Sequence, residues 1–219
     1  MVEKEYIFTF LRDLSQNNSK DWMDDNRERY HKAKERWLYE VSEILNRLSE
    51  HDSYFQSFNA KDVIMRINNK RQFHQNRPLY KDYFGCAPTR KKDAVSKLHI
   101  AAGLSWSFIG GGLWRPDSKN LNKVRKAIAE NGDELIEIVE DSDFRNFFGG
   151  LAEDPDKLKT SPQNYKNDHK YIDLLRYKSI TAQINLTQKI VISDGFTDFV
   201  EETYLKLRPL TDFLEKAVA

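Results

Sequence analysis

The sequence predicts an α+β fold in which a central antiparallel or mixed sheet carries helices from both chain ends on one face. Two observations favour this class. Apolar residues recur at helical spacing near both ends of the 219-residue chain and alternate with polar residues in its middle. Strands that cluster between helices indicate α+β, whereas regular alternation of strands and helices would indicate α/β. The length fits a single domain over residues 1–219.

Two helices are expected before the sheet. The first covers Tyr6–Leu14. The second begins after Ser19, a residue type that caps helix N-termini, and runs to about Ser49. Its apolar residues recur every three or four positions: Tyr30, Ala33, Trp37, Val41, Ile44, Leu45 and Leu48. This spacing places them on one face, so the helix is expected to pack on the core.

Alternation with a period of two residues predicts strands in the middle of the chain. The segments are Asp62–Asn68, Lys97–Leu104, Trp106–Trp114 and Lys178–Leu186. Gly103 suits a turn between the second and third of them. If one face of this sheet is buried, its other face carries polar side chains, namely Arg66, His99, Thr181 and Gln183. A covering loop, Asn68–Lys81, would make that face a cationic cleft, and the alternative is a plain solvated sheet face.

Helical spacing returns after the third predicted strand. The apolar residues that mark these helices are Leu121, Val124 and Ile128, then Leu135, Ile136 and Val139, then Phe144, Phe147 and Phe148, and finally Phe196, Phe199, Val200 and Leu207. Pro209 suits the first turn of a last helix. Asp168 is expected to cap a short helix over Tyr171–Tyr177, with an alternative in which it orients His169 for catalysis.

Several motifs exclude common chemistries. Gly110–Gly112 lacks the spacing of a phosphate-binding loop, so a bulge or a close backbone approach is expected there. The alternative is that these glycines leave room for a ligand beside Trp106 and Trp114. The five histidines show no metal-ligand spacing, and the single cysteine, Cys86, excludes a disulfide within the chain. No metal and no cofactor are therefore expected.

The charge is unevenly distributed although the net charge is only +1. Residues 66–92 hold eight Lys and Arg against Asp82 alone, and residues 117–156 hold eleven acids against five cations. The N-terminal segment MVEKEYIFTF lacks the basic start of a signal peptide, and no apolar run reaches the length of a spanning helix. These features favour a cytoplasmic protein without a membrane segment. The basic stretch is either a functional patch or a solvated surface.

Several sequence blocks, taken in order, resemble one family. They read FLRDLSQNNSKDWMDDNRERY, RINNKRQFHQNRPLYKDYFG, SFIGGGLWRPD, LKTSPQNYKNDH and LLRYKS. The chain resembles the bacterial proteins grouped as domain of unknown function 2461, from about Tyr6 to Val218. The family implies no activity.

The resemblance carries a signature of basic residues onto this chain. The family pattern Arg-x-x-Arg-Asp-x-Arg-Phe begins at Arg66 and ends at Phe73, and later positions fall on Asn76, Arg77, Tyr80 and Lys81. Its central residues are replaced here by Asn69, Lys70 and Gln72. If the signature is catalytic, this copy should be weakened. If it is a structural clasp, neutral hydrogen bonds have replaced its ions.

Three functions follow as hypotheses. The first is binding of a small phosphate- or carboxylate-bearing ligand, by residues drawn from the signature and the polar sheet face: Arg66, Asn76, Arg77, Tyr80, Lys81, His99, Arg176 and Lys178. A nucleic-acid version, stacking bases on Phe73, Tyr80 or Tyr83, is disfavoured by the low net charge. The second is an enzyme acting on a small anion, with His99 or His169 moving protons. The third is a ligand-free structural or interaction protein, in which the signature loop braces the sheet.

Overall fold

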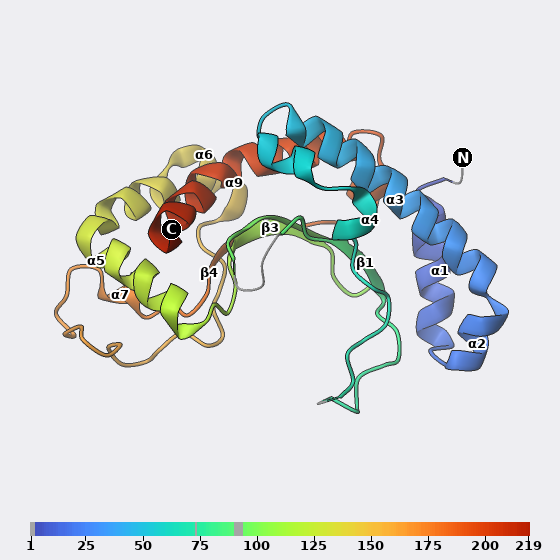
Figure 1. Ribbon diagram of the computed structural model, residues 1–219, viewed down its shortest axis with the longest axis horizontal. Coiled ribbons are helices and arrows are strands. Elements are labelled where there is room, and N and C mark those ends of the chain that lie inside the picture. The colour runs from blue at the N-terminus through green and yellow to red at the C-terminus, as the bar shows by residue number, and fades with distance from the viewer. Residues whose placement is uncertain (1–2, 73, 90–93) are drawn as a thin grey trace. The chain divides into compact units, whose positions relative to one another are not determined.

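The computed structural model describes residues 3–72, 74–89 and 94–219. The protein is α+β, as predicted, with helices before and after a sheet in the chain (Figure 1). Within the described residues the sheet is antiparallel and has the strand order β1-β2-β3-β4. The strands are β1 (Tyr83–Cys86), β2 (Ser96–Gly103), β3 (Phe108–Leu113) and β4 (Ile180–Asn185). That helices from both chain ends cover one face stays a prediction.

The chain divides into two compact units. The first comprises Met1–Pro88, His99–Ile109 and Asn185–Glu202. The second comprises Thr89–Leu98, Gly110–Ile184 and Thr203–Ala219. The single domain expected over the whole chain stays a prediction.

Helices at the N-terminus form the frame of the first unit: α1 (Glu5–Gln16), α2 (Lys20–Asp25) and α3 (Arg27–Ser49). Ser19 caps α2, because its hydroxyl accepts the backbone N–H of Trp22 at 3.2 Å. The single helix expected from Ser19 to Ser49 is wrong, since Asn26 leaves helical geometry at φ −107° and ψ 21°. The apolar face of α3 is buried as predicted, with Trp37 and Val41 fully covered.

Aromatic rings pack α1 and α3 against the sheet. The Phe84 ring of β1 lies 6.4 Å from the Phe10 ring of α1 and 6.4 Å from the Tyr30 ring of α3. Tyr30 and Phe84 are nearly parallel, with an interplanar angle of 12°. Offset stacking of this kind adds to the free energy gained by burying the rings.

The strand predicted over Asp62–Asn68 is wrong. After the short helix η1 (Ser53–Ser57), the chain forms α4 (Ala60–Val63) and only then becomes extended. The extended residues still pair with the chain around β1, because Met65 N–H donates to Gly85 O at 2.8 Å and Ala87 N–H to Val63 O at 3.0 Å. The β1 strand itself was not predicted, since Tyr-Phe-Gly-Cys contains no polar residue and so shows no alternation.

The second unit has its own helical core. It includes α5 (Ser118–Glu140), α6 (Ser142–Phe148) and α7 (Ile172–Leu175). The two helices expected around Val124 and Leu135 form one helix that is kinked at Asn131. A Cβ on the neighbouring Gly132 would lie 2.6 Å from the Tyr171 ring, so glycine permits this packing.

The C-terminal helices depart from the prediction at Pro209. After α8 (Gln188–Ile192), α9 runs without interruption over Phe196–Val218, and Pro209 lies inside it. A separate last helix beginning at Pro209 is therefore wrong. Leu207 and Leu210, on either side of this proline, are fully buried in the core of the second unit. Their burial outweighs the local cost of the missing backbone donor.

The Gly110–Gly112 stretch is a close backbone approach, as expected. A Cβ on Gly110 would lie 2.6 Å from Ala182 O, and one on Gly111 would lie 2.6 Å from Ser96 O. Gly112 has φ +116°, a conformation that disfavours other residues. These glycines therefore let β3 lie tightly between its neighbours.

The predicted cap at Asp168 is wrong. The short helix α7 has Tyr171 at its N-cap position and no side-chain cap. The imidazole of His169 bonds the backbone at the start of this helix instead, because its Nδ1 accepts the backbone N–H of Tyr171 at 3.1 Å. His169 therefore serves the local backbone.

Candidate functional site

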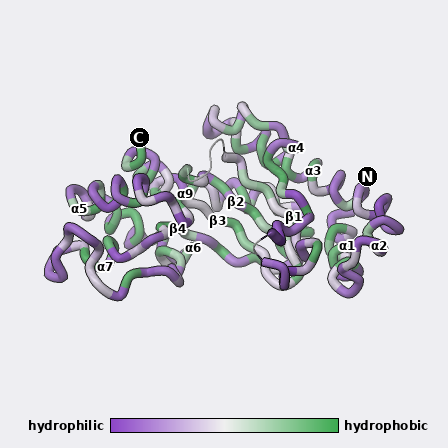
Figure 2. The backbone as a smooth tube through the Cα atoms, turned by 60° about the horizontal axis from the view of Figure 1, so that its bottom comes forward, coloured by the Kyte–Doolittle hydropathy of each residue, from purple (hydrophilic) through white to green (hydrophobic). Residues whose placement is uncertain are grey.

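A hairpin holds the residues of the basic signature. Within residues 66–81, here called the signature hairpin, Asn69 N–H donates to Leu79 O at 2.9 Å and Lys81 N–H to Ile67 O at 2.8 Å. The tip of the hairpin, beyond the bond between Asn69 and Leu79, is hydrophilic (Figure 2). Turns in the tip are closed by His74 N–H on Arg71 O and by Arg77 N–H on His74 O, both at 3.1 Å. Phe73 lies outside the described residues.

Tyr80 anchors the returning arm of the hairpin. Its side chain is buried, and its backbone is held at both ends by the side chain of Asn18. Asn18 Oδ1 accepts the Tyr80 N–H at 2.9 Å, and Asn18 Nδ2 donates to Tyr80 O at 3.0 Å. The segment before α2 therefore fixes the position of the returning arm of the hairpin within the first unit.

The ammonium of Lys81 ties the two arms together. It donates to Arg66 O, and to Asn68 O at 2.9 Å. Desolvation lowers the pKa of Lys81, and the positive charge of Lys70 lowers it further. An ammonium has three N–H donors, so one remains for a ligand.

Asn69 makes a second tie across the hairpin. Its side-chain Nδ2 donates to Pro78 O at 3.0 Å. At this position a neutral amide therefore makes a neutral hydrogen bond to a backbone carbonyl. The arrangement favours a bracing role for this position.

A cavity of about 450 Å³ opens beside the hairpin. It is lined by Ser15, Asn18, Asn69, Arg77, Pro78, Tyr80, Lys81, Asp82 and Tyr83. The one carboxylate among these residues, Asp82, accepts a hydrogen bond from the Ser105 hydroxyl at 2.6 Å. Amide, hydroxyl, guanidinium and ammonium groups thus converge on a space large enough for a small molecule.

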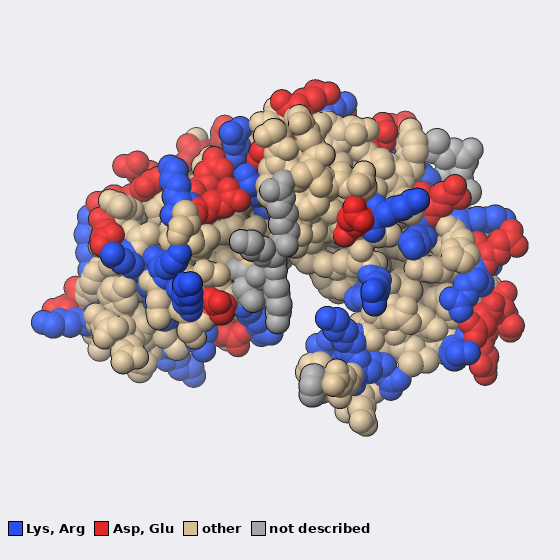
Figure 3. All heavy atoms as spheres, viewed as in Figure 1, with Lys and Arg blue, Asp and Glu red and all other residues tan. Residues whose placement is uncertain are grey.

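The hairpin cations are not neutralised. The side chains of Arg66, Lys70 and Arg77 form no ion pair with any residue that the structure describes, whereas Arg29, Arg36 and Arg47 of the same unit each have a carboxylate partner. Figure 3 shows Lys and Arg side chains gathered over the hairpin. Like charges held together without counter-charges raise the local electrostatic free energy, and a bound anion would lower it.

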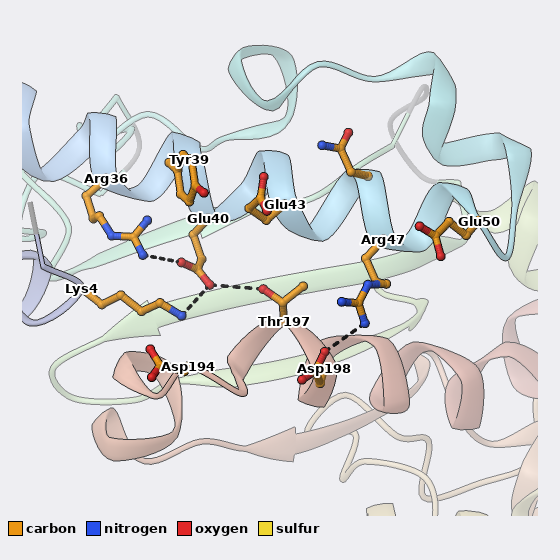
Figure 4. Close-up of a pocket in the computed structure, with 11 residues that line it drawn as sticks. Lys4, Arg36, Tyr39, Glu40, Glu43, Arg47, Glu50, Asp194, Thr197 and Asp198 are labelled. Atoms are coloured by element: carbon orange, nitrogen blue, oxygen red, sulfur yellow. Dashed lines mark hydrogen bonds and ion pairs between the residues drawn. The ribbon is translucent and has the colours of Figure 1, made fainter. Parts of the chain in front are cut away.

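A second cavity of the first unit, of about 470 Å³, has a different charge balance. Its lining includes three cations and five carboxylates, among them Arg36, Glu40 and Asp198. Figure 4 shows Lys4, Arg36 and Thr197 converging on Glu40. The distances to the Glu40 carboxylate are 2.9 Å from Lys4 and 2.8 Å from Arg36. Because these cations already have partners, the cavity fits a small anion less well than the one beside the hairpin.

The other predicted site residues are dispersed. Asn76 is exposed at the hairpin tip and forms no hydrogen bond with the described residues. His99, on β2, lies with its ring 5.1 Å from Phe108, and desolvation lowers its pKa to about 4. Its imidazole is therefore neutral at pH 7 and adds no charge for an anion. The basic residues Arg90, Lys91 and Lys92 lie outside the described residues.

Arg176 and Lys178 belong to the second unit. Arg176 pairs with Asp173 at 2.9 Å, and its buried Nε has no partner among the described residues. The backbone N–H of Lys178 donates to the buried carboxylate of Asp154 at 2.6 Å. Asp154 also accepts the N–H of Ser179 at 3.0 Å, so it organises the start of β4.

Within residues 3–72, 74–89 and 94–219, no three His, Cys, Asp or Glu side chains are grouped so that they could hold a metal ion. No helix of this part of the chain is long and apolar enough to cross a membrane.

Comparisons with known proteins give one family. A family model described as "Conserved hypothetical protein (DUF2461)" matches residues 6–213. No curated protein matches the chain, and no solved structure matches it.

Proposed function

Since the chain belongs to the DUF2461 family of conserved hypothetical proteins, a name that assigns no activity, we propose from its own residues that it binds a small phosphate- or carboxylate-bearing ligand in the cavity beside the signature hairpin. One observation carries this proposal. Arg77 and Lys81 line a cavity of about 450 Å³, while the one carboxylate in its lining, Asp82, is held by Ser105.

Arg77 is the residue best suited to grip the anion. Its guanidinium forms no hydrogen bond or ion pair within the described part of the chain, and it lies close enough to influence the ionisation of Tyr83. A guanidinium can offer two parallel N–H donors to one phosphate or carboxylate group. Lys81, four residues further along the returning arm, adds a second positive charge and one free N–H donor beside the cavity.

An enzyme acting on a small anion is the second candidate. The residues that line the cavity include no histidine, cysteine or glutamate, so its candidates for proton transfer are Tyr80, Lys81, Asp82 and Tyr83. His99 would be a weak base, because the pKa is lowered to about 4. Binding is therefore favoured over catalysis.

A bracing role is favoured for Lys81 and Asn69 by their hydrogen bonds to backbone carbonyls. This role is compatible with ligand binding, because a braced hairpin holds Arg77 in place beside the cavity.

We also propose that the protein works in a bacterial cytoplasm. In support, the chain has one cysteine, Cys86, and so forms no disulfide within itself, as is usual in a reducing compartment.

The proposal is tested by calorimetric titration of the full chain with inorganic phosphate and with small dicarboxylates. We expect saturable binding that Arg77→Gln weakens at least tenfold. Lys61→Gln is the matched control, because it removes one charge from an exposed residue of α4 outside the hairpin. Equal weakening by both variants would indicate bulk electrostatics and would contradict a site at Arg77.

A further inference from the structure

A row of aromatic side chains starts at the cavity and continues along the sheet. The Tyr83 ring, which lines the cavity, lies 5.1 Å from the Trp106 ring. Trp106 stacks on Phe108 at 5.1 Å with an interplanar angle of 16°, and Phe108 lies 5.1 Å from His99. All of these residues belong to the first unit. The row therefore joins an aromatic surface to the cationic cavity.

The turn that carries Trp106 is fixed at its base by Gly103 and Ser107. Ser107 Oγ accepts the Gly103 N–H at 2.9 Å and donates to Gly103 O at 3.0 Å. Gly103 pairs with Tyr83 across β1 and β2, and a Cβ on it would lie 2.7 Å from Trp106 O. Glycine thus lets Trp106 and Tyr83 approach each other.

The same turn is tied to the cavity lining. Leu104 N–H donates to Asp82 O at 3.1 Å, and the Ser105 hydroxyl donates to the Asp82 carboxylate at 2.6 Å. Both bonds hold Trp106 beside the cavity. The Ser105 bond also engages the one carboxylate there that would repel an anion.

Trp106 remains 47% exposed despite this fixed position. Because burial of an indole stabilises a protein, a half-exposed indole forgoes part of that stabilisation. Trp114 is also exposed, but it contacts the Arg115 guanidinium and belongs to no aromatic row among the described residues. Trp106 lies between Tyr83 and Phe108 in the row, and the exposed part of its fixed indole offers a surface on which a planar ring can stack.

We propose that the anionic ligand of the cavity carries a planar heteroaromatic ring, as a mononucleotide does. This inference rests on the proposed function. The phosphate would lie at Arg77 and Lys81, and the base would lie against Trp106 and Tyr83. The cavity has the volume of a small-molecule site, and one basic hairpin cannot follow the successive phosphates of a strand. These two points favour a mononucleotide over a nucleic acid.

The test compares four ligands by calorimetry on the full chain: inorganic phosphate, ribose 5-phosphate, the 5′-mononucleotides and the corresponding nucleosides. Stacking of a base should make a mononucleotide bind roughly ten- to a hundredfold more tightly than ribose 5-phosphate. Trp106→Leu should abolish this gain and leave the affinity for ribose 5-phosphate unchanged. Trp114→Leu is the matched control and should change neither affinity.

A second measurement does not depend on a variant. In the wild-type protein, a bound mononucleotide should give nuclear Overhauser effects between its base protons and the Trp106 indole. Their presence supports the proposal even if Trp106→Leu fails to fold. Effects confined to other aromatic residues would overturn it.

The outcomes separate the two proposals. Equal affinities for mononucleotides and ribose 5-phosphate would overturn the aromatic subsite and leave the anion site in place. Absence of binding by every phosphate compound and by the dicarboxylates would overturn both. A short single-stranded oligonucleotide that binds far more tightly than any mononucleotide, with a steep salt dependence, would overturn the mononucleotide in favour of a strand.

Discussion

Asn18 pairs with the backbone of Tyr80 as an adjacent strand would, accepting its N–H at 2.9 Å and donating to its carbonyl at 3.0 Å. The two residues are 62 positions apart in the sequence. One amide side chain thus satisfies two backbone groups of a residue whose own side chain is buried. The signature hairpin depends on this contact for its attachment to the segment between α1 and α2.

Asn18→Ala is therefore expected to destabilise the protein. It removes two hydrogen bonds and leaves partly buried backbone groups unpaired, at a cost of about 1–3 kcal/mol in the free energy of unfolding. Urea denaturation measures this difference. Asn76→Ala is the control, because Asn76 is exposed in the same hairpin and forms no hydrogen bond in the described part of the chain. Equal stability of the Asn18 and Asn76 variants would contradict the role of Asn18.

Glu40→Gln is expected to be the more damaging of two substitutions on the same face of α3. The Glu40 carboxylate accepts from Arg36 at 2.8 Å and from Lys4 at 2.9 Å, and both Arg36 and Glu40 are buried. Losing the negative charge leaves a buried guanidinium without a counter-charge, which costs about 3–5 kcal/mol. Thermal unfolding measures the loss.

Glu43→Gln supplies the control for that comparison. Glu43 lines the same cavity (Figure 4) but is exposed and has no ion-pair partner within the described residues. We expect a change of less than about 0.5 kcal/mol. If the two variants lose stability equally, the Glu40 cluster does not stabilise the fold as the structure indicates.

The lowered pKa of His99 predicts that the folded protein loses stability in acid. Desolvation lowers its pKa from 6.5 to about 4, so the unfolded chain binds a proton more readily than the folded one between these values. The stability contributed by the neutral ring is present above pH 6.5 and is lost as pH falls toward 4. A shift of this size corresponds to about 3 kcal/mol.

The measurement is urea denaturation of His99→Phe across this pH range. Removing the imidazole should flatten the acid limb of the stability profile, while His74→Gln, at an exposed tip residue, should leave the profile unchanged. A profile for His99→Phe that matches the wild type would show that other groups cause the acid sensitivity.

Periodicity predicted those elements of the fold whose apolar residues recur at regular spacing in the sequence. The helical spacing around Trp37 and the alternation around Ile100 and Ala182 correspond to α3, β2 and β4. The strand β1 escaped prediction because all of its side chains are apolar or glycine. The break at Asn26 escaped it as well, since no glycine or proline marks the end of α2.

The composition of the sequence predicted the basic residues of the candidate site, but it did not predict the neutral residues that line the same cavity. Arg77 and Lys81 stand in the basic stretch, and the structure places both beside one cavity. Asn18 and Ser15 come from a distant segment, and no local pattern links them to the hairpin. His99 was expected among the ligand-binding residues, but desolvation lowers its pKa to about 4, so its imidazole is neutral at pH 7. The sequence alone does not report this desolvation.

Substitutions at Arg77 and at Lys81 should distinguish ligand binding from structural bracing of the hairpin. The Lys81 ammonium donates to two backbone carbonyls, whereas the Arg77 guanidinium bonds to none of the described residues. Lys81→Met should therefore lower the free energy of unfolding by about 1–3 kcal/mol and speed amide exchange at Asn69 and Lys81. Arg77→Gln should leave stability unchanged and weaken phosphate binding. The reverse pattern would contradict both assignments.

The ionisation of Lys81 gives a more direct test of the anion site. Its pKa is lowered by desolvation and by Lys70, so NMR titration of the Lys81 side chain should show a value below that of an ordinary lysine. A phosphate bound nearby favours the charged ammonium and should raise that pKa toward the ordinary value. By linkage, phosphate affinity should fall as pH rises through the lowered pKa of Lys81. An unchanged Lys81 pKa at saturating phosphate would place the anion elsewhere.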